Sequence, residues 1–299
     1  MTKSFTNLLG IIITIVAGIY FYLNYCSSCG ATVNDVPAAV VAAAPDPTSY
    51  PFAFSNGAFA FKVNENYNFN LSSSDILKPL SPKVGRGIQG LRVFLAENPD
   101  KSFNITGYYT NGENNNTAFP NLGLARANAV KNHLVSQGIS STQINTMGKQ
   151  MDLMVPDGNV YRGPIVYAIE GENDTQKEDL NALYDQIKTD PLILYFEKSK
   201  SSIELSPEQR QQFANISKYL DKDANASCTI TGYTDNTSSR TTNLVLGQRR
   251  AEFAKAYLVK NGISEARLKT SSKGPDDPVA SNGTEEGRSK NRRTVVTLN

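Results

Sequence analysis

An internal repeat constrains the fold of this chain more than any other feature. Three short motifs each occur twice, as Leu80-Ser81-Pro82 and Leu205-Ser206-Pro207, as Ile105-Thr106-Gly107-Tyr108 and Ile230-Thr231-Gly232-Tyr233, and as Leu134-Val135 and Leu258-Val259. The first two motifs recur after 125 residues and the third after 124. A nearly constant offset over this length indicates two copies of one domain, and a chain of 299 residues is long enough for two domains of ordinary size.

The second copy alternates strand and helix signals. Ser206 followed by Pro207 predicts a helix start, because serine caps the free N–H groups of a first turn and proline fits there. Gly262 predicts the end of a second, longer helix. Strands are expected at 192–196, 229–233, 267–270 and 293–298. This order predicts an α/β fold class with two tandem two-layer α/β sandwiches.

Arg250 lies on the apolar row of the longer helix, between Leu246 and Phe253. Burying a guanidinium without an anion is costly, so we expect a carboxylate to face it. Asp235, fifteen residues earlier at the end of a predicted strand and turn, is the nearest candidate. Opposite charges lining one cleft suit a zwitterion, whose ammonium can meet Asp235 while its carboxylate takes the fork of Arg250. An ordinary ion pair that holds the loop to the helix is the alternative.

At these residues the chain resembles the peptidoglycan-binding OmpA-like domain, found in OmpA C-terminal regions, Pal lipoproteins and MotB-type stator proteins. The resemblance covers about residues 191–299 and rests on four segments: Gly232-Tyr233-Thr234-Asp235-Asn236-Thr237, Asn243-Leu244-Val245-Leu246-Gly247-Gln248-Arg249-Arg250-Ala251, Leu258-Val259 with Gly262-Ile263, and Thr284-Glu285-Glu286-Gly287-Arg288-Ser289-Lys290-Asn291-Arg292-Arg293.

The resemblance implies that Asp235 and Arg250 clamp the amino acid end of diaminopimelate in the peptidoglycan stem peptide. Four further residues match positions of the family's pocket: Thr234, Thr237, Asn243 and Arg292. Gly247 is a departure, because the family usually has serine there, and we expect it to loosen the first turns of the helix.

The first copy lacks one half of this clamp. Thr110 stands where the carboxylate is needed, while Arg126 is retained. Glu113, in the following loop, is an alternative carboxylate that we favour less. We therefore expect a degenerate OmpA-like copy that holds a zwitterion poorly, since the ligand's ammonium would lose water without gaining a partner.

The N-terminal part contains an uncharged apolar run at 8–25, LLGIIITIVAGIYFYLNY. As a helix it would be about 27 Å long, close to the hydrocarbon thickness of a bilayer. Lys3 precedes the run and the next basic residue is Lys62, so we expect a cytoplasmic N-terminal tip and an exported bulk. The sequence therefore predicts a single N-terminal transmembrane helix that contacts the lipid bilayer.

A lipoprotein with its lipid on Cys26 or Cys29 is the alternative to this anchor. In either case we place the bulk of the protein in the periplasm of a Gram-negative bacterium. The predicted division of the chain is an anchor with its juxtamembrane segment at 1–30, a flexible spacer at 31–50, the degenerate copy at 51–172, a linker at 173–190 and the second copy at 191–299.

Composition excludes several classes of function. A net charge of +2 from 30 basic and 28 acidic residues gives no basic stripe, so nucleic acid is not an expected partner. A single histidine and three cysteines offer no cluster with metal-ligand spacing, and we expect no metal, no cofactor and no enzymatic activity. The apolar run has no acidic residue, which argues against an ion-driven stator.

We therefore expect non-covalent binding of diaminopimelate-containing peptidoglycan by the second copy, which would tether the membrane to the cell wall. The alternative is a membrane-anchored subunit of an envelope assembly, whose first copy docks a partner protein.

Overall fold

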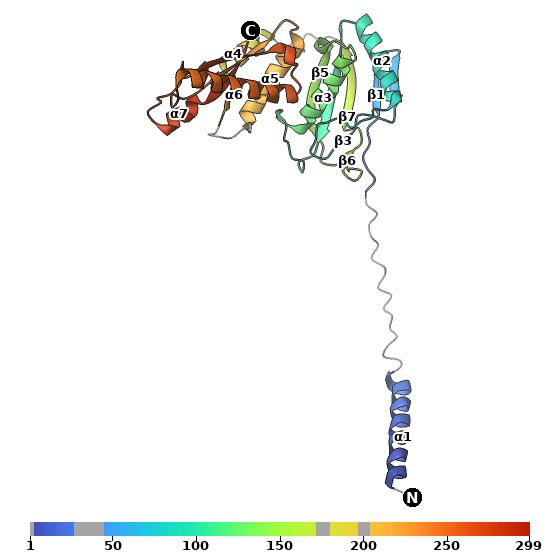
Figure 1. Ribbon diagram of the computed structural model, residues 1–299. Helices are drawn as coiled ribbons and strands as arrows, with labels where there is room; N and C mark the ends of the chain where they lie inside the picture. Colours follow the sequence, from blue (N-terminus) through green and yellow to red (C-terminus); the bar gives the residue numbers. More distant parts are fainter. Residues whose placement is uncertain (1–2, 27–44, 172–179, 197–203) are drawn as a thin grey trace. The chain divides into compact units, whose positions relative to one another are not determined.

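The computed structural model describes residues 3–26, 45–171, 180–196 and 204–299 (Figure 1). The chain divides into two compact units, residues 1–45 and 46–299. The described part of the smaller unit contains helix α1 (Lys3–Phe21), which continues as a π-helical segment, η1 (Tyr22–Cys26).

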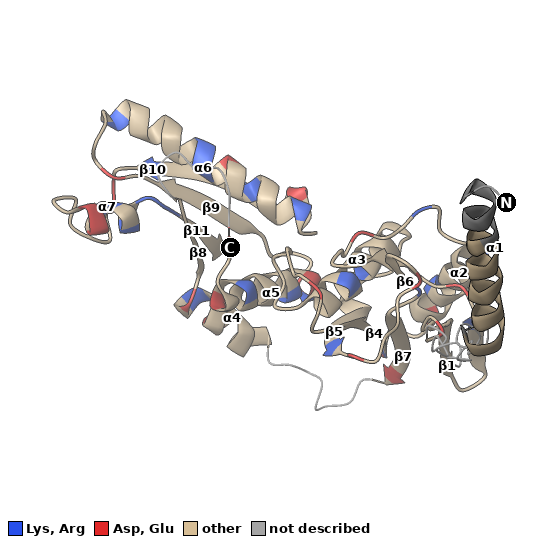
Figure 2. Ribbon diagram, turned by 90° about the horizontal axis from the view of Figure 1, so that it is seen from below, with Lys and Arg blue, Asp and Glu red and all other residues tan. Residues whose placement is uncertain are grey.

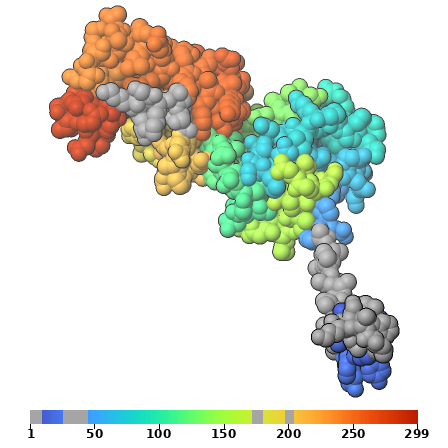
Figure 3. Space-filling model, turned by 60° about the horizontal axis from the view of Figure 1, so that its bottom comes forward, coloured from blue at the N-terminus to red at the C-terminus, as the bar shows by residue number. Residues whose placement is uncertain are grey.

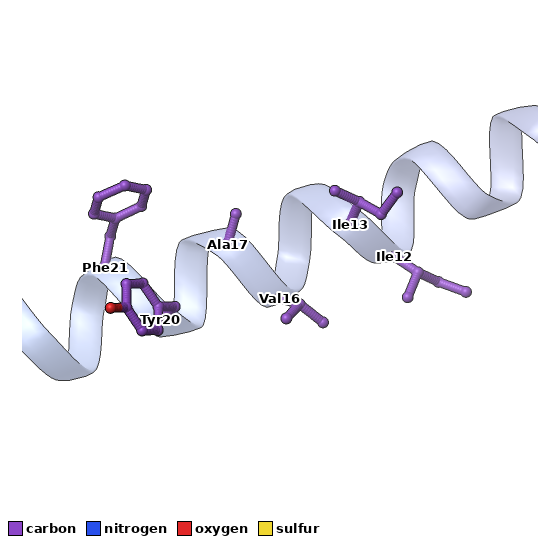
Figure 4. A pocket seen from close by; sticks show the side chains of 6 residues that line it. All are labelled: Ile12, Ile13, Val16, Ala17, Tyr20 and Phe21. Atoms are coloured by element: carbon purple, nitrogen blue, oxygen red, sulfur yellow. The ribbon is translucent and has the colours of Figure 1, made fainter.

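Apolar side chains cover α1, and those from Ile11 onward are about half or more exposed. Six of them line a shallow depression on the surface of the helix (Figure 4): Ile12, Ile13, Val16, Ala17, Tyr20 and Phe21. Within the described part of the chain, no helix meets the length and apolarity that crossing a membrane requires. The expected helix over 8–25 is therefore present, but its membrane-spanning character is not supported. Cys29 and most of the spacer at 31–50 lie outside the described residues.

The second copy is built on a four-stranded sheet. Its strands are β8 (Leu192–Tyr195), β9 (Cys228–Tyr233), β10 (Leu268–Gly274) and β11 (Arg293–Leu298), in the order β10-β9-β11-β8. Strands β9 and β10 are parallel, and β11 is antiparallel to both β9 and β8.

Helices cover one face of this sheet: α4 (Leu180–Thr189), α5 (Pro207–Lys222) and α6 (Arg240–Lys260), with the short α7 (Glu285–Asn291) before β11. Figure 2 shows α6 lying along β9 and β10. Helix α4 corrects the predicted linker at 173–190, because Leu183 and Ile187 are buried in the core of the second copy. In Figure 3 the red segment around α7 protrudes at one edge of the domain.

The first copy has a related sheet of three strands, β4 (Lys101–Tyr109), β5 (Ile144–Gln150) and β7 (Ile165–Gly171). Their order is β5-β4-β7, with β4 parallel to β5 and antiparallel to β7. This matches the order and orientation of β10-β9-β11. Helices α2 (Pro82–Glu97) and α3 (Leu122–Ser136) complete the layer, with two small sheets made of β1 (Phe52–Asn56), β2 (Phe59–Val63), β3 (Phe69–Asn70) and β6 (Val160–Tyr161).

The repeated Leu-Ser-Pro motif starts a helix in both copies. The Ser81 hydroxyl accepts the N–H of Lys83 at 3.2 Å, and the Ser206 hydroxyl accepts the N–H of Gln209 at 3.2 Å. In each helix the following proline occupies the first turn, where its missing N–H costs nothing. The repeat in sequence is thus a repeat of helix capping.

Glycines set the closest contact between helix and sheet in both copies. A Cβ atom on Gly232 of β9 would lie 1.9 Å from the carbonyl oxygen of Gly247 on α6, and one on Gly107 would lie 2.1 Å from that of Gly123. A Cβ on Gly247 would itself lie 2.9 Å from the Gly232 oxygen. Gly247 was expected to loosen the helix, but it instead allows α6 to pack directly on the strand that leads to Asp235.

The two copies share part of a core. Ala118, Phe119, Leu122 and Ala125 of the first copy belong to the apolar cluster of the second. The ring of Phe119 meets that of Phe213 edge to face, with 5.0 Å between centroids.

Polar contacts reinforce this junction. The ammonium of Lys131, almost fully buried, pairs with the carboxylate of Asp221. The side chain of Asn261 accepts the N–H of Ala118 at 2.8 Å. These contacts fix the first copy to helices α5 and α6 of the second.

Candidate functional site

Asp235 lies just beyond the carboxyl end of β9 and is buried. Its Oδ1 atom accepts the Thr237 hydroxyl at 2.6 Å and the Thr237 N–H at 3.1 Å, and its Oδ2 accepts Nη1 of Arg292 at 3.0 Å. Burial raises the pKa of Asp235, but the hydrogen bonds from Thr237 and Arg292 outweigh it, so the pKa lies below its ordinary value. The site therefore holds a fixed, ionised carboxylate at neutral pH.

Arg250 reaches the same region from α6 and is half-buried. Its Nη1 donates to the carbonyl oxygen of Tyr233 at 3.1 Å, and its guanidinium lies 5.6 Å from the ring centroid of Phe196. Burial lowers the pKa of Arg250, the charge of Asp235 opposes this and the charge of Arg292 adds to it. Among the described residues, Arg250 has this one hydrogen bond and no carboxylate partner, although a guanidinium carries five N–H donors.

Arg292 is the cation that pairs with Asp235. It stands at the end of α7, and its Nη2 donates to Glu285 at 2.8 Å while its Nη1 holds Asp235. Burial lowers the pKa of Arg292, but the hydrogen bonds to Asp235 and Glu285 outweigh it and raise the pKa above the ordinary value. Its buried Nε has no partner among the described residues. The ion pair with Asp235, which the sequence analysis kept as an alternative for Arg250, is thus formed by Arg292.

The other predicted residues shape the loop rather than line an open surface. The Thr234 hydroxyl donates to the Asp235 carbonyl oxygen at 2.8 Å, and Asn243, which is buried, donates from Nδ2 to the Ser238 carbonyl oxygen at 3.0 Å. Thr237 is exposed and holds Asp235 directly. Ser239 caps α6, and Asn243 lies within the first turns of this helix.

Glu285 is a site residue that sequence reasoning missed. Its carboxylate forms ion pairs with Arg292 and Arg288, which both follow it within seven residues. The only signal in the sequence was an acidic residue one helix length ahead of Arg292, which is common on solvated helices.

The corresponding site of the first copy is closed by its own chain. Arg126 is fully buried, and its Nη1 and Nη2 donate to the carboxylate of Glu113 at 3.1 and 2.5 Å. The remaining donors reach the carbonyl oxygens of Tyr108, Asn70 and Ser73. The sequence favoured an Arg126 without a carboxylate partner, and this was wrong: Glu113, the alternative, folds back from the loop and satisfies Arg126 together with the three carbonyl oxygens.

The sequence model of the OmpA family matches residues 68–156 and 195–292, more than half of the chain. This chain belongs to the OmpA family. The predicted resemblance is confirmed, and the family match includes the first copy as well as the second.

Relatives match the chain over one domain. It is 34% identical over 98 residues to the probable lipoprotein YiaD of Escherichia coli, a match that covers 33% of this chain and 45% of YiaD. It is 38% identical over 95 residues to the peptidoglycan-binding protein ArfA of Mycobacterium tuberculosis, covering 32% of this chain and 29% of ArfA. The match therefore spans less than half the length of either relative.

A crystal structure of the peptidoglycan-associated lipoprotein from Burkholderia pseudomallei is also similar. It is 27% identical, and the match covers 36% of this chain and 89% of that chain with a TM-score of 0.32.

Proposed function

We propose that the second copy binds peptidoglycan non-covalently through the diaminopimelate residue of its stem peptide. The observation that carries this proposal is the guanidinium of Arg250, which has no carboxylate partner among the described residues and lies close enough to Asp235 for the two charges to interact. A relative, ArfA, is named a peptidoglycan-binding protein, which agrees with the proposal. The proposed activity is binding alone, without a chemical step.

Diaminopimelate suits this arrangement because its side chain ends in an ammonium and a carboxylate on one carbon atom. The carboxylate would accept two N–H groups from the Arg250 fork, and the ammonium would donate to Asp235. Asp235 is already held in place by Thr237, so little ordering is required when the ligand arrives. Arg292 holds the other side of Asp235 and keeps the carboxylate ionised.

The biological role that we propose is a tether in the Gram-negative envelope, with the second copy in the periplasm. The exposed apolar side chains between Ile11 and Tyr25 would attach the other end of the chain to a membrane, directly or together with a lipid. Attachment at one end raises the local concentration of the site near the wall, so a weak site would still be effective. Partner docking by the first copy is a weaker alternative, because its loop at 117–119 already contacts the second copy.

Sedimentation with purified sacculi tests the proposed binding. We expect Asp235→Asn and Arg250→Lys to abolish co-sedimentation, the second because lysine keeps the charge but loses the fork. Arg249→Lys is the matched control, since Arg249 is the exposed neighbour on the same helix. Circular dichroism should show an unchanged fold in all three variants. Retained sedimentation of Asp235→Asn and Arg250→Lys would refute the assigned site.

A further inference from the structure

Arg126 and Arg250 share two kinds of neighbour in the two copies. Each donates from Nη1 to the carbonyl oxygen of a tyrosine, Tyr108 at 2.9 Å and Tyr233 at 3.1 Å. Each guanidinium lies 5.6 Å from the ring centroid of a phenylalanine, Phe69 for Arg126 and Phe196 for Arg250. The two arginines therefore occupy equivalent positions in the two copies.

The site of the first copy is occupied by the carboxylate of Glu113. Besides the two bonds from Arg126, its Oε2 accepts the N–H of Thr110 at 3.0 Å and its Oε1 accepts the N–H of Ser72 at 3.0 Å. The Glu113 side chain is only 3% exposed. Four N–H donors thus surround a single carboxylate, as in a built ligand site.

The described residues of the second copy include two of these donors, the guanidinium of Arg250 and the N–H of Asp235, and no carboxylate bound to them. The 125-residue offset places Asp235 where the first copy has Thr110. The N–H of Thr110 binds Glu113, whereas no partner for the N–H of Asp235 is found among the described residues. In the loop that follows Asp235, the N–H and hydroxyl groups of Thr237 donate hydrogen bonds to Asp235 and not to Arg250.

We propose that the first copy contains a second carboxylate-binding site, which the chain closes with its own Glu113. The ligand class of this site is a small monocarboxylate. It has no preference for an ammonium, because Thr110 stands at the position of Asp235. While Glu113 occupies this site, the site takes no free ligand. The proposal stands on the first copy alone and does not depend on peptidoglycan binding by the second.

Replacement of Glu113 by a free ligand tests the proposal. Glu113→Ala removes the CH₂–COO⁻ group beyond Cβ, which is the size of acetate, and leaves Arg126 buried without an anion. The full chain of this variant should melt at a lower temperature than the wild type. Acetate should then raise the melting temperature of Glu113→Ala by about 2–4 °C for each tenfold increase in acetate concentration above the dissociation constant. Chloride at the same ionic strength should not reproduce this rise.

Two controls separate site occupancy from a general salt effect. Glu113→Gln keeps the volume filled, and Glu113→Ala combined with Arg126→Leu removes the cation. In neither variant should acetate raise the melting temperature more than it does in the wild type. If Glu113→Ala fails to fold in chloride, refolding in acetate becomes the readout. The proposal is overturned if acetate gives no gain over chloride in melting or refolding, or if the double variant gains as much as Glu113→Ala.

Discussion

Asp235 and Arg292 form a nearly buried ion pair, with 3.0 Å between Oδ2 and Nη1 and 11% of each side chain exposed. The pair joins the end of β9 to the start of β11, two neighbouring strands of one sheet. Arg250 is left with a backbone carbonyl and an aromatic ring as its partners among the described residues. In the part of the chain that the structure describes, Arg292 thus holds the carboxylate of Asp235, and Arg250 does not.

Arg292→Gln should destabilise the protein at neutral pH by about 1–3 kcal/mol, because it leaves a buried carboxylate without its charged partner. The pKa of Asp235 lies below its ordinary value of 3.8, so the pair contributes stability above that pH. This contribution is lost as the pH falls through the pKa of the folded state. The free energies of unfolding of the wild type and of Arg292→Gln, measured with urea, should therefore converge as the pH falls below 3.8. A difference that stays constant down to pH 2 would contradict the ion-pair explanation.

Glu285→Gln should weaken diaminopimelate binding by about two- to fivefold at low salt. Without the Glu285 carboxylate, the guanidinium of Arg292 interacts more strongly with Asp235. It then competes with the ligand's ammonium for that carboxylate. Calorimetric titration should detect the effect, which should shrink in 0.5 M NaCl because Glu285 is largely exposed. Glu286→Gln is the matched control, since it makes the same charge change on the same helix without an ion pair among the described residues. Equal effects of the two variants would argue against the role given to Glu285.

Phe119→Ala should destabilise the second copy although the residue belongs to the first. Phe119 is 4% exposed and packs on Phe213 of α5, so the cavity should cost about 3–5 kcal/mol. Hydrogen exchange should rise in α5. Phe94→Ala, which removes a ring stacked on Phe59 within the first copy, should leave α5 unchanged. Unchanged exchange of α5 in Phe119→Ala would mean that the two cores are independent.

His133 provides a pH probe of the first copy, because the chain has a single histidine. Its Nδ1 shares a hydrogen bond of 2.8 Å with the Tyr67 hydroxyl. Burial, and after it the charge of Lys78, lowers the pKa of His133 below 6.5. The unfolded chain therefore binds a proton first as the pH falls below 6.5, and stability should decline from there down to the folded pKa. Titration of the imidazole signal by NMR with a midpoint at or above 6.5 would contradict this.

The sequence predicted those features that local chemistry determines. The Ser-Pro helix starts, the strand that ends before Asp235 and the helix that carries Arg250 all follow from patterns within a few residues. The family resemblance added the roles of these two residues, which no local pattern contains.

Features that depend on the path of a loop were not predictable in this way. Glu113 and Arg126 are separated by a loop without a periodic pattern, and only the folded chain shows that the loop turns back over the arginine. The choice of Arg292 over Arg250 as the partner of Asp235 likewise depends on how β11 lies beside β9. Helix α4 was taken for linker because its apolar stripe consists of few residues, Leu183 and Ile187 among them.

The most direct test of the proposed function is calorimetric titration of the full chain in detergent with two soluble stem peptides. The peptides differ in one residue, which is diaminopimelate in one and lysine in the other. Lysine keeps the ammonium for Asp235 but has no carboxylate for Arg250, so we predict at least about tenfold weaker binding. The diaminopimelate peptide should bind at one site per chain. Equal affinity for the two peptides would contradict the account.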